Sequence, residues 1–111
     1  MPLQAPSVDS PVLADMVRRL VEVYHPERIY LFGSAARGEA TVDSDYDLMV
    51  IVPDHSPSEA RDSGRAYEAL WGVGTSGDIL VWLRSAFERQ LHLKASLPST
   101  ILREGKLVYG A

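Results

Sequence analysis

Hydrophobic positions in this chain first follow a helical period and then fall into short apolar runs. Between Ser10-Pro11 and His25-Pro26 the apolar residues form one stripe, recurring every three or four positions: Leu13, Met16, Val17, Leu20, Val21 and Tyr24. This spacing predicts an amphipathic helix facing the core, with Ser10 as its N-cap and Pro11 in its first turn. Its polar side carries both signs of charge, which disfavours a helix lying on a membrane surface.

Four apolar runs rich in β-branched or aromatic residues predict strands. They cover residues 28–32, 45–52, 78–83 and 107–109. Helical patterns lie between them, so we expect a small α/β fold with a mixed, largely antiparallel sheet of about four strands and helices packed against it. Residues 10–111 are predicted to form this single domain, and residues 1–9, which contain two prolines, a flexible lead-in.

Two capping-box spacings predict further helices. Ser56 with Glu59 would open a helix running to Leu70 or Trp71, and Ser85 with Glu88 one running to about Lys94. The glycine-rich stretch between them lacks the Lys-Ser/Thr ending of a phosphate-binding P-loop and precedes a strand, so residues 72–77 are interpreted as a connector.

Two shorter helical segments complete the expected elements. Residues 34–38 can begin a short helix, and residues 98–104 form a helical turn that should place Ile101 and Leu102 in the core. Tryptophan is a large apolar residue, so both Trp71 and Trp82 are expected to be core residues rather than platforms for a nucleobase.

Composition narrows the class of protein. The chain has 111 residues, of which 46% are hydrophobic and 23% charged, a balance typical of one globular domain. The 15 acidic against 11 basic residues give a net charge of -4, which argues against strong nucleic-acid binding. There is no cysteine for a thiolate metal site, no signal-peptide pattern, and no apolar run near the roughly 18 residues that span a bilayer. A cytoplasmic protein without a membrane segment is therefore expected.

The strand at residues 45–52 carries two carboxylates at its start. Successive side chains of a strand alternate faces, so Asp45 and Asp47 project together and Tyr46 points away. Adjacent carboxylates repel unless a cation lies between them, and Mg²⁺ held by carboxylate and phosphate oxygens is the ordinary solution. Asp78 begins another strand. Because residues 78, 80 and 82 lie on one face of that strand, Trp82 is expected on the same face as Asp78. Each feature alone is unremarkable, but their joint order favours metal-dependent group transfer.

A family resemblance supports this interpretation. Gly33-Ser34 through Arg37-Gly38, followed by Ser44-Asp45-Tyr46-Asp47-Leu48, resembles the signature of the nucleotidyltransferase superfamily related to DNA polymerase β. The chain is similar to the minimal nucleotidyltransferase (MNT) family, in which Gly-Ser-x-Ala-Arg-Gly precedes Ser-Asp-x-Asp-Leu. The similarity covers nearly the whole chain, including the strand that begins with Asp78 and the ending at residues 101–109.

The resemblance implies transfer of a nucleoside monophosphate from a triphosphate, with ATP as substrate and two Mg²⁺ ions. Asp45 and Asp47 would contact the ions, and Asp78 would complete the second ion site, where the acceptor hydroxyl binds.

It also implies that the turn at residues 33–38 receives the phosphates. Gly33 would let the triphosphate approach the backbone, and the Ser34 hydroxyl would donate to it. Arg37 would either contact phosphate or tie the turn to the carboxylate strand, and the sequence favours neither. Ser44 is interpreted as a turn residue, and His25, His55 and His92 as surface residues.

The resemblance further implies a partner. Larger relatives carry a second, helical domain that shapes the acceptor site, so here that site is expected from another chain, a second copy or a protein substrate. In the MNT family the partner is a helical HEPN-type toxin, and transfer of AMP from ATP to a toxin hydroxyl, typically of tyrosine, makes the transferase an antitoxin. Two alternatives stay open: the catalytic subunit of a two-chain small-molecule nucleotidyltransferase, and a non-catalytic module that neutralises the toxin by contact. A homo-oligomer is compatible with all three.

Overall fold

A computed structural model describes residues 5–110 of the chain. Helix α1 (Pro11–Tyr24) begins where the sequence predicts it, because the Ser10 hydroxyl accepts a hydrogen bond from the Val12 N–H at 3.1 Å. The helix ends at Tyr24, where His25 turns the chain with a left-handed φ of 46°. Its buried stripe is formed by Leu13, Met16, Leu20 and Tyr24.

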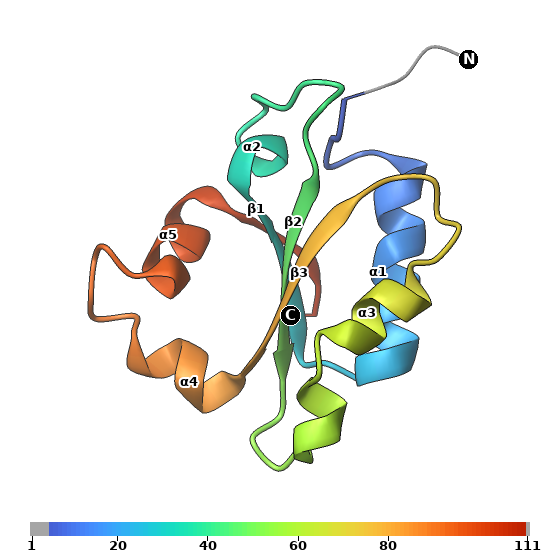
Figure 1. Ribbon diagram of the computed structural model, residues 1–111. Coiled ribbons are helices and arrows are strands. Elements are labelled where there is room, and N and C mark those ends of the chain that lie inside the picture. Colours follow the sequence, from blue (N-terminus) through green and yellow to red (C-terminus); the bar gives the residue numbers. More distant parts are fainter. Residues whose placement is uncertain (1–4, 111) are drawn as a thin grey trace.

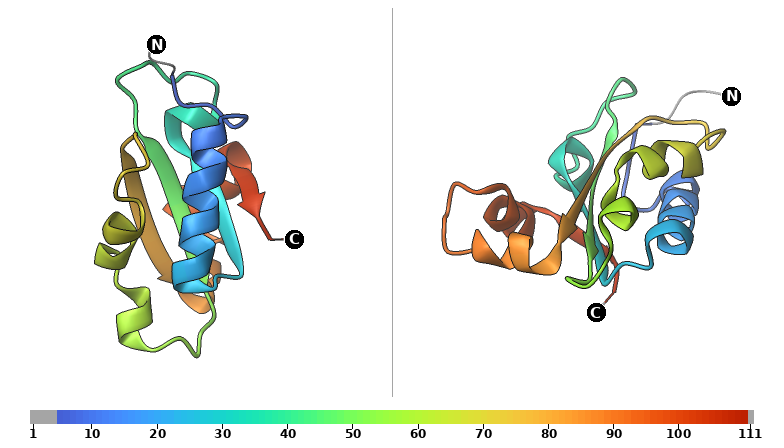
Figure 2. Two further views of the ribbon diagram at one scale, coloured as in Figure 1. Left: turned by 90° about the vertical axis from the view of Figure 1, so that its right-hand side faces the viewer. Right: turned by 60° about the horizontal axis from the view of Figure 1, so that its bottom comes forward.

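The four predicted strands are present and form one mixed sheet. Their bounds are Arg28–Phe32 for β1, Tyr46–Val52 for β2, Gly77–Leu83 for β3 and Lys106–Tyr109 for β4. The strand order is β3-β2-β1-β4, with β1 antiparallel to both β2 and β4, and β2 parallel to β3 (Figure 2). The expectation of a small, largely antiparallel α/β sheet is confirmed.

Helices cover both faces of the sheet. Figure 1 shows α1 and α3 on one side and α4 and α5 on the other. The bounds of the three later helices are Gly64–Ala69 for α3, Arg84–Arg89 for α4 and Leu97–Glu104 for α5. Leu48 and Val50 of β2 pack on the α1 side, while Met49 and Ile51 pack on the other. Because both of its faces are buried, β2 appears in the sequence as a continuous apolar run rather than an alternating one.

The long helix predicted from Ser56 to Leu70 or Trp71 is wrong. The structure has a 3-10 turn, η1 (Ser58–Arg61), followed by the separate helix α3. The break lies at Asp62, whose side chain accepts a hydrogen bond from the Gly64 N–H at 2.9 Å. This side-chain turn offers the backbone an alternative to a continuous helix.

Helix α4 also departs from its prediction. Ser85 does not cap it: the helix begins at Arg84, and the Ser85 N–H donates instead to the Asp54 carboxylate at 2.9 Å. It ends at Arg89, short of Lys94. A side-chain acceptor from a distant loop has therefore replaced the local capping box.

Two predicted core residues are exposed. Leu102 on α5 is 49% exposed, whereas Ile101 is buried as expected. Trp71 is 85% exposed, because it follows α3 at the start of the connector rather than lying inside a longer helix. The connector interpretation of residues 72–77 otherwise agrees with the structure, in which β3 begins at Gly77.

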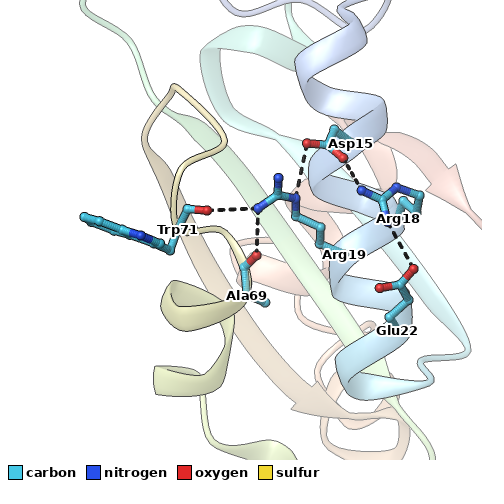
Figure 3. Close-up of polar contacts among 6 residues, drawn as sticks. All are labelled: Asp15, Arg18, Arg19, Glu22, Ala69 and Trp71. Carbon is cyan, nitrogen blue, oxygen red and sulfur yellow. Dashed lines mark hydrogen bonds and ion pairs between the residues drawn. The ribbon is translucent and has the colours of Figure 1, made fainter.

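Arg19 joins α1 to the segment around Trp71. Its guanidinium donates to the carbonyls of Ala69 at 3.2 Å and Trp71 at 2.9 Å, and its Nε lies 3.2 Å from the Asp15 carboxylate (Figure 3). The contact anchors the backbone that leads through the connector to β3. The exposed Trp71 ring therefore projects from a backbone that is held in place.

No helix in residues 5–110 is both long and apolar enough to cross a membrane. Of the predicted lead-in, residues 1–4 lie outside the described part of the chain, as does Ala111 at the predicted domain end. Ser7 lies within the described part, and its N–H donates to the Tyr46 hydroxyl at 3.2 Å.

Candidate active site

The candidate residues gather at one end of the sheet. Strand β1 ends there at Phe32, while β2 and β3 begin there at Tyr46 and Gly77. A single helical turn, α2 (Gly33–Ala36), follows β1 at this end (Figure 1). The fold thus brings together a turn and two strand starts that are far apart in the sequence.

Asp47 and Asp78 are direct neighbours in the parallel pairing of β2 and β3. Partners in a ladder point to the same face, so the two carboxylates share the face that holds Met49 and Leu80. Asp45 immediately precedes β2, two residues before Asp47. Among residues 5–110, no three His, Cys, Asp or Glu side chains are already arranged as the ligand set of a metal ion. The sheet aligns the carboxylates, but the side chains do not converge on one point.

The pKa of Asp47 is raised above its ordinary value. Burial is the largest cause, and the negative charges of Asp78 and Asp45 add to it, while the Arg37 guanidinium acts in the opposite direction. Two neighbouring negative charges therefore oppose the ionisation of Asp47 at this end of the sheet. A bound cation would reverse that opposition.

Gly33 determines how closely the turn approaches Asp47. Its φ of 73° lies in the left-handed region that favours glycine, and a Cβ at this position would overlap the Asp47 carboxylate. Any other residue would have to displace that carboxylate or the turn. Gly33 therefore allows close packing of the backbone against the candidate metal ligand.

Ser34 and Arg37 lie in the same turn. Ser34 is half-buried, and its carbonyl accepts a hydrogen bond from the Glu39 N–H at 2.9 Å. The Arg37 Nε lies 3.1 Å from the Glu39 carboxylate, an ion pair on the surface. Sequence reasoning missed Glu39, although opposite charges two residues apart in Arg37-Gly38-Glu39 are a signal that could have indicated the pair.

The loop before β2 places Asp45. The Ser44 hydroxyl accepts a hydrogen bond from the Thr41 N–H at 2.9 Å, so Ser44 is the turn residue that the sequence predicted. Asp45 itself is exposed. Tyr46 points to the opposite face and is buried there, as the strand alternation requires.

Trp82 lies on the same face of β3 as Asp78 but at the far end of the strand, opposite Ile51. Trp82 follows Asp78 by four positions of extended chain, or about 13 Å. The Trp82 side chain is therefore remote from the carboxylates of its own chain. The three histidines are exposed, as predicted.

The donor set at this end fits a hard divalent cation. Asp45, Asp47 and Asp78 offer only carboxylate oxygens, the ligands that Mg²⁺ prefers, and the raised pKa of Asp47 marks a position where positive charge is favourable. The chemistry of the residues therefore suits Mg²⁺.

Comparison with known proteins identifies the family. Residues 13–108 match the model of the nucleotidyltransferase domain family. The chain therefore belongs to that family, and the superfamily resemblance is confirmed. No curated protein sequence matches it.

Three solved structures share this fold. A toxin-antitoxin structure with AMP-PNP is 24% identical, with a TM-score of 0.60 over 87% of this chain and 73% of that chain. A mutant of the toxin-antitoxin MntA-HpeT is 21% identical, with a TM-score of 0.56 over 86% and 71%. A tri-AMPylated Shewanella oneidensis HEPN toxin in complex with MNT antitoxin is 20% identical, with a TM-score of 0.52 over 90% and 73%. At these identities the likeness shows a common fold.

Proposed function

We propose that this chain is a Mg²⁺-dependent nucleotidyltransferase that moves AMP from ATP to a tyrosine hydroxyl of a HEPN-type toxin and thereby acts as an antitoxin. The observation that carries the proposal is the direct pairing of Asp47 with Asp78 on one face, beside the glycine turn at Gly33. The fold shared with MNT antitoxins supports the choice of partner.

Each residue has a role in this scheme. Asp45 and Asp47 would hold the nucleotide-side Mg²⁺, and Asp78 with them a second ion. These ions would supply charge stabilisation for the attacking and leaving oxygens. Gly33 leaves room for the triphosphate at the backbone, and Ser34 donates its hydroxyl hydrogen to a phosphate oxygen. The acceptor hydroxyl loses its proton to water, its oxygen bonds to the α-phosphorus, the bond from the α-phosphorus to the β-phosphate oxygen breaks, and pyrophosphate leaves.

The decisive experiment uses intact mass. The purified chain is mixed with Mg²⁺, each nucleoside triphosphate in turn, and a candidate HEPN-type toxin. We expect the partner to gain the mass of AMP only with ATP, at a tyrosine located by peptide mapping. An unmodified partner would contradict the proposal.

Two other results would favour one of the two alternative functions over this proposal. Label transferred from ATP to a small metabolite, with the partner unchanged, would indicate a two-chain small-molecule enzyme. Undiminished neutralisation of the toxin by the Asp45→Asn/Asp47→Asn double variant would indicate a binding module. An Asp43→Asn variant, altered in the same loop, serves as the matched control for both assays.

A further inference from the structure

Strand β3 is an open edge of the sheet (Figure 2). The Tyr46 N–H donates to the Ser76 carbonyl at 3.2 Å, which sets the phase of the parallel ladder with β2. In that phase the main-chain groups of Ile79 and Val81 point away from β2. Within residues 5–110 no hydrogen bond joins either residue to a segment outside the sheet. This edge therefore retains groups that can pair with another strand.

The edge also lacks the sequence features that normally prevent such pairing. Strand β3 is seven residues long and contains neither proline nor lysine, and its only charged residue is Asp78 at one end. Leu80 to Leu83 are half-buried and apolar. A strand of this kind favours association rather than isolation in solvent.

A hollow of about 490 Å³ borders the other end of the edge. It is lined by Trp82 and Leu83 of the strand, by Arg61 of η1 and by Arg89 of α4, among others. Neither arginine forms an ion pair within the described part of the chain. Asp78 thus lies at one end of β3 and the guanidinium groups of Arg61 and Arg89 at the other, where the charge of Arg89 also acts on the Asp54 carboxylate.

We propose that β3 pairs antiparallel with β3 of a second copy of this chain about a two-fold axis at Leu80. The phase of the ladder allows this register, because Ile79 and Val81 of the two copies then exchange their outer main-chain hydrogen bonds, and the charges at the two ends of the strand select it among the registers of the same phase. Asp78 then lies opposite Trp82 of the second copy, at the hollow between its Arg61 and Arg89. Charge complementarity at both ends selects the second copy as the occupant.

This pairing would extend the candidate active site, a consequence that rests on the proposed function. The Trp82 ring is remote from the carboxylates of its own chain but would border those of the other copy. The arginines of the second copy would bring positive charge to the same place. Each copy would then supply an aromatic and a cationic side chain beside the nucleotide site of its partner.

The test measures association of the full chain without nucleotide or metal. Sedimentation over a wide concentration series should show a dimer at the concentrations of an NMR sample, with slowed amide exchange at Ile79 and Val81. Val81→Pro removes an outer N–H and should give a monomer with an unchanged circular dichroism spectrum. A chain that stays monomeric, or a folded Val81→Pro dimer, overturns the proposal.

Charge reversal provides a second test that does not depend on Val81. Arg61→Glu/Arg89→Glu should weaken the dimer at least tenfold, and adding Asp78→Arg should restore it, whereas the control pair Lys94→Glu/Arg103→Glu should leave it unchanged. Failure of the restoration overturns the proposed register. If the wild-type chain transfers no AMP in the mass assay, the proposed function is refuted. The dimer measurement does not depend on that result, because it uses neither nucleotide nor metal.

Discussion

Asp47 is the residue of the site whose charge is opposed most clearly. Burial, and then the negative charges of Asp78 and Asp45, raise its pKa. The folded state binds a proton at Asp47 more readily than the unfolded state does. Its contribution to stability is therefore present below about pH 4 and lost as the pH rises through the raised pKa. A protein without bound metal is accordingly destabilised at neutral pH by its own candidate ligand.

The Asp47→Asn variant should consequently be more stable than the wild type at neutral pH without metal, and the difference should vanish below about pH 4. Urea unfolding across a pH series measures this. Its transfer activity should fall by about 100-fold or more, since a metal ion contributes several kcal/mol to the transition state. Asp43→Asn should keep the wild-type profile and activity, and a metal-free Asp47→Asn protein less stable than the wild type at pH 7 would contradict the argument.

Gly33 provides a second test at the scale of one residue. Gly33→Ala should lower the free energy of unfolding by about 1–2 kcal/mol from its left-handed backbone alone. It should also abolish transfer, because the new Cβ displaces the Asp47 carboxylate. Gly72→Ala is the matched control, since Gly72 has a φ of 80° with nothing within 4 Å of an added Cβ. It should lose similar stability in denaturant melts but retain activity, and equal activity in both variants would count against the role of Gly33.

At the scale of elements, the position of α3 depends on contacts from α1 rather than on its own sequence. The helix has only six residues and no side-chain cap, too few to be stable alone. Arg19 holds the carbonyls at its end (Figure 3). The connector that leads to Asp78 is thereby anchored.

Replacing Arg19 tests this anchor. Arg19→Met retains much of the apolar stem but leaves the Ala69 and Trp71 carbonyls without their donor, and should cost about 1–2 kcal/mol in thermal or urea unfolding. Arg18→Met is the control and should change stability little, since Arg18 is exposed and, within residues 5–110, bonds only Asp15 and Glu22 of its own helix. Equal effects of the two variants would mean that the link from α1 to α3 is not structural.

At the scale of the whole molecule, the proposed metal binding would be coupled to folding, because Asp47 and Asp78 are neighbours only when β2 and β3 are paired. Mg²⁺ should therefore raise the melting temperature of the wild type, by an amount equivalent to about 2.7 kcal/mol at 100 times its dissociation constant. Asp45→Asn/Asp47→Asn should remove the shift, which differential scanning fluorimetry can follow. If only Ca²⁺ raises the melting temperature, or if the shift with Mg²⁺ survives in the double variant, these carboxylates are not the Mg²⁺ site.

The sequence alone determined the local features of this protein. The stripe from Leu13 to Tyr24 and the apolar runs of the strands are set by spacing within a few residues, and the prediction that Asp45 lies with Asp47 rests on the same kind of spacing. The family signature likewise occupies one short stretch, Gly33 to Leu48. These features could be predicted because neighbouring residues suffice to define them.

The tertiary structure alone decided what depends on distant contacts. Asp54 replaced the expected cap at Ser85, and the exposure of Leu102 and Trp71 followed from where α5 and α3 came to lie. The register that pairs Asp47 with Asp78, and the open outer edge of β3, follow from strand order. Local periodicity carries no information about which strand becomes a neighbour, so a sequence can supply the carboxylates while only the fold brings them together.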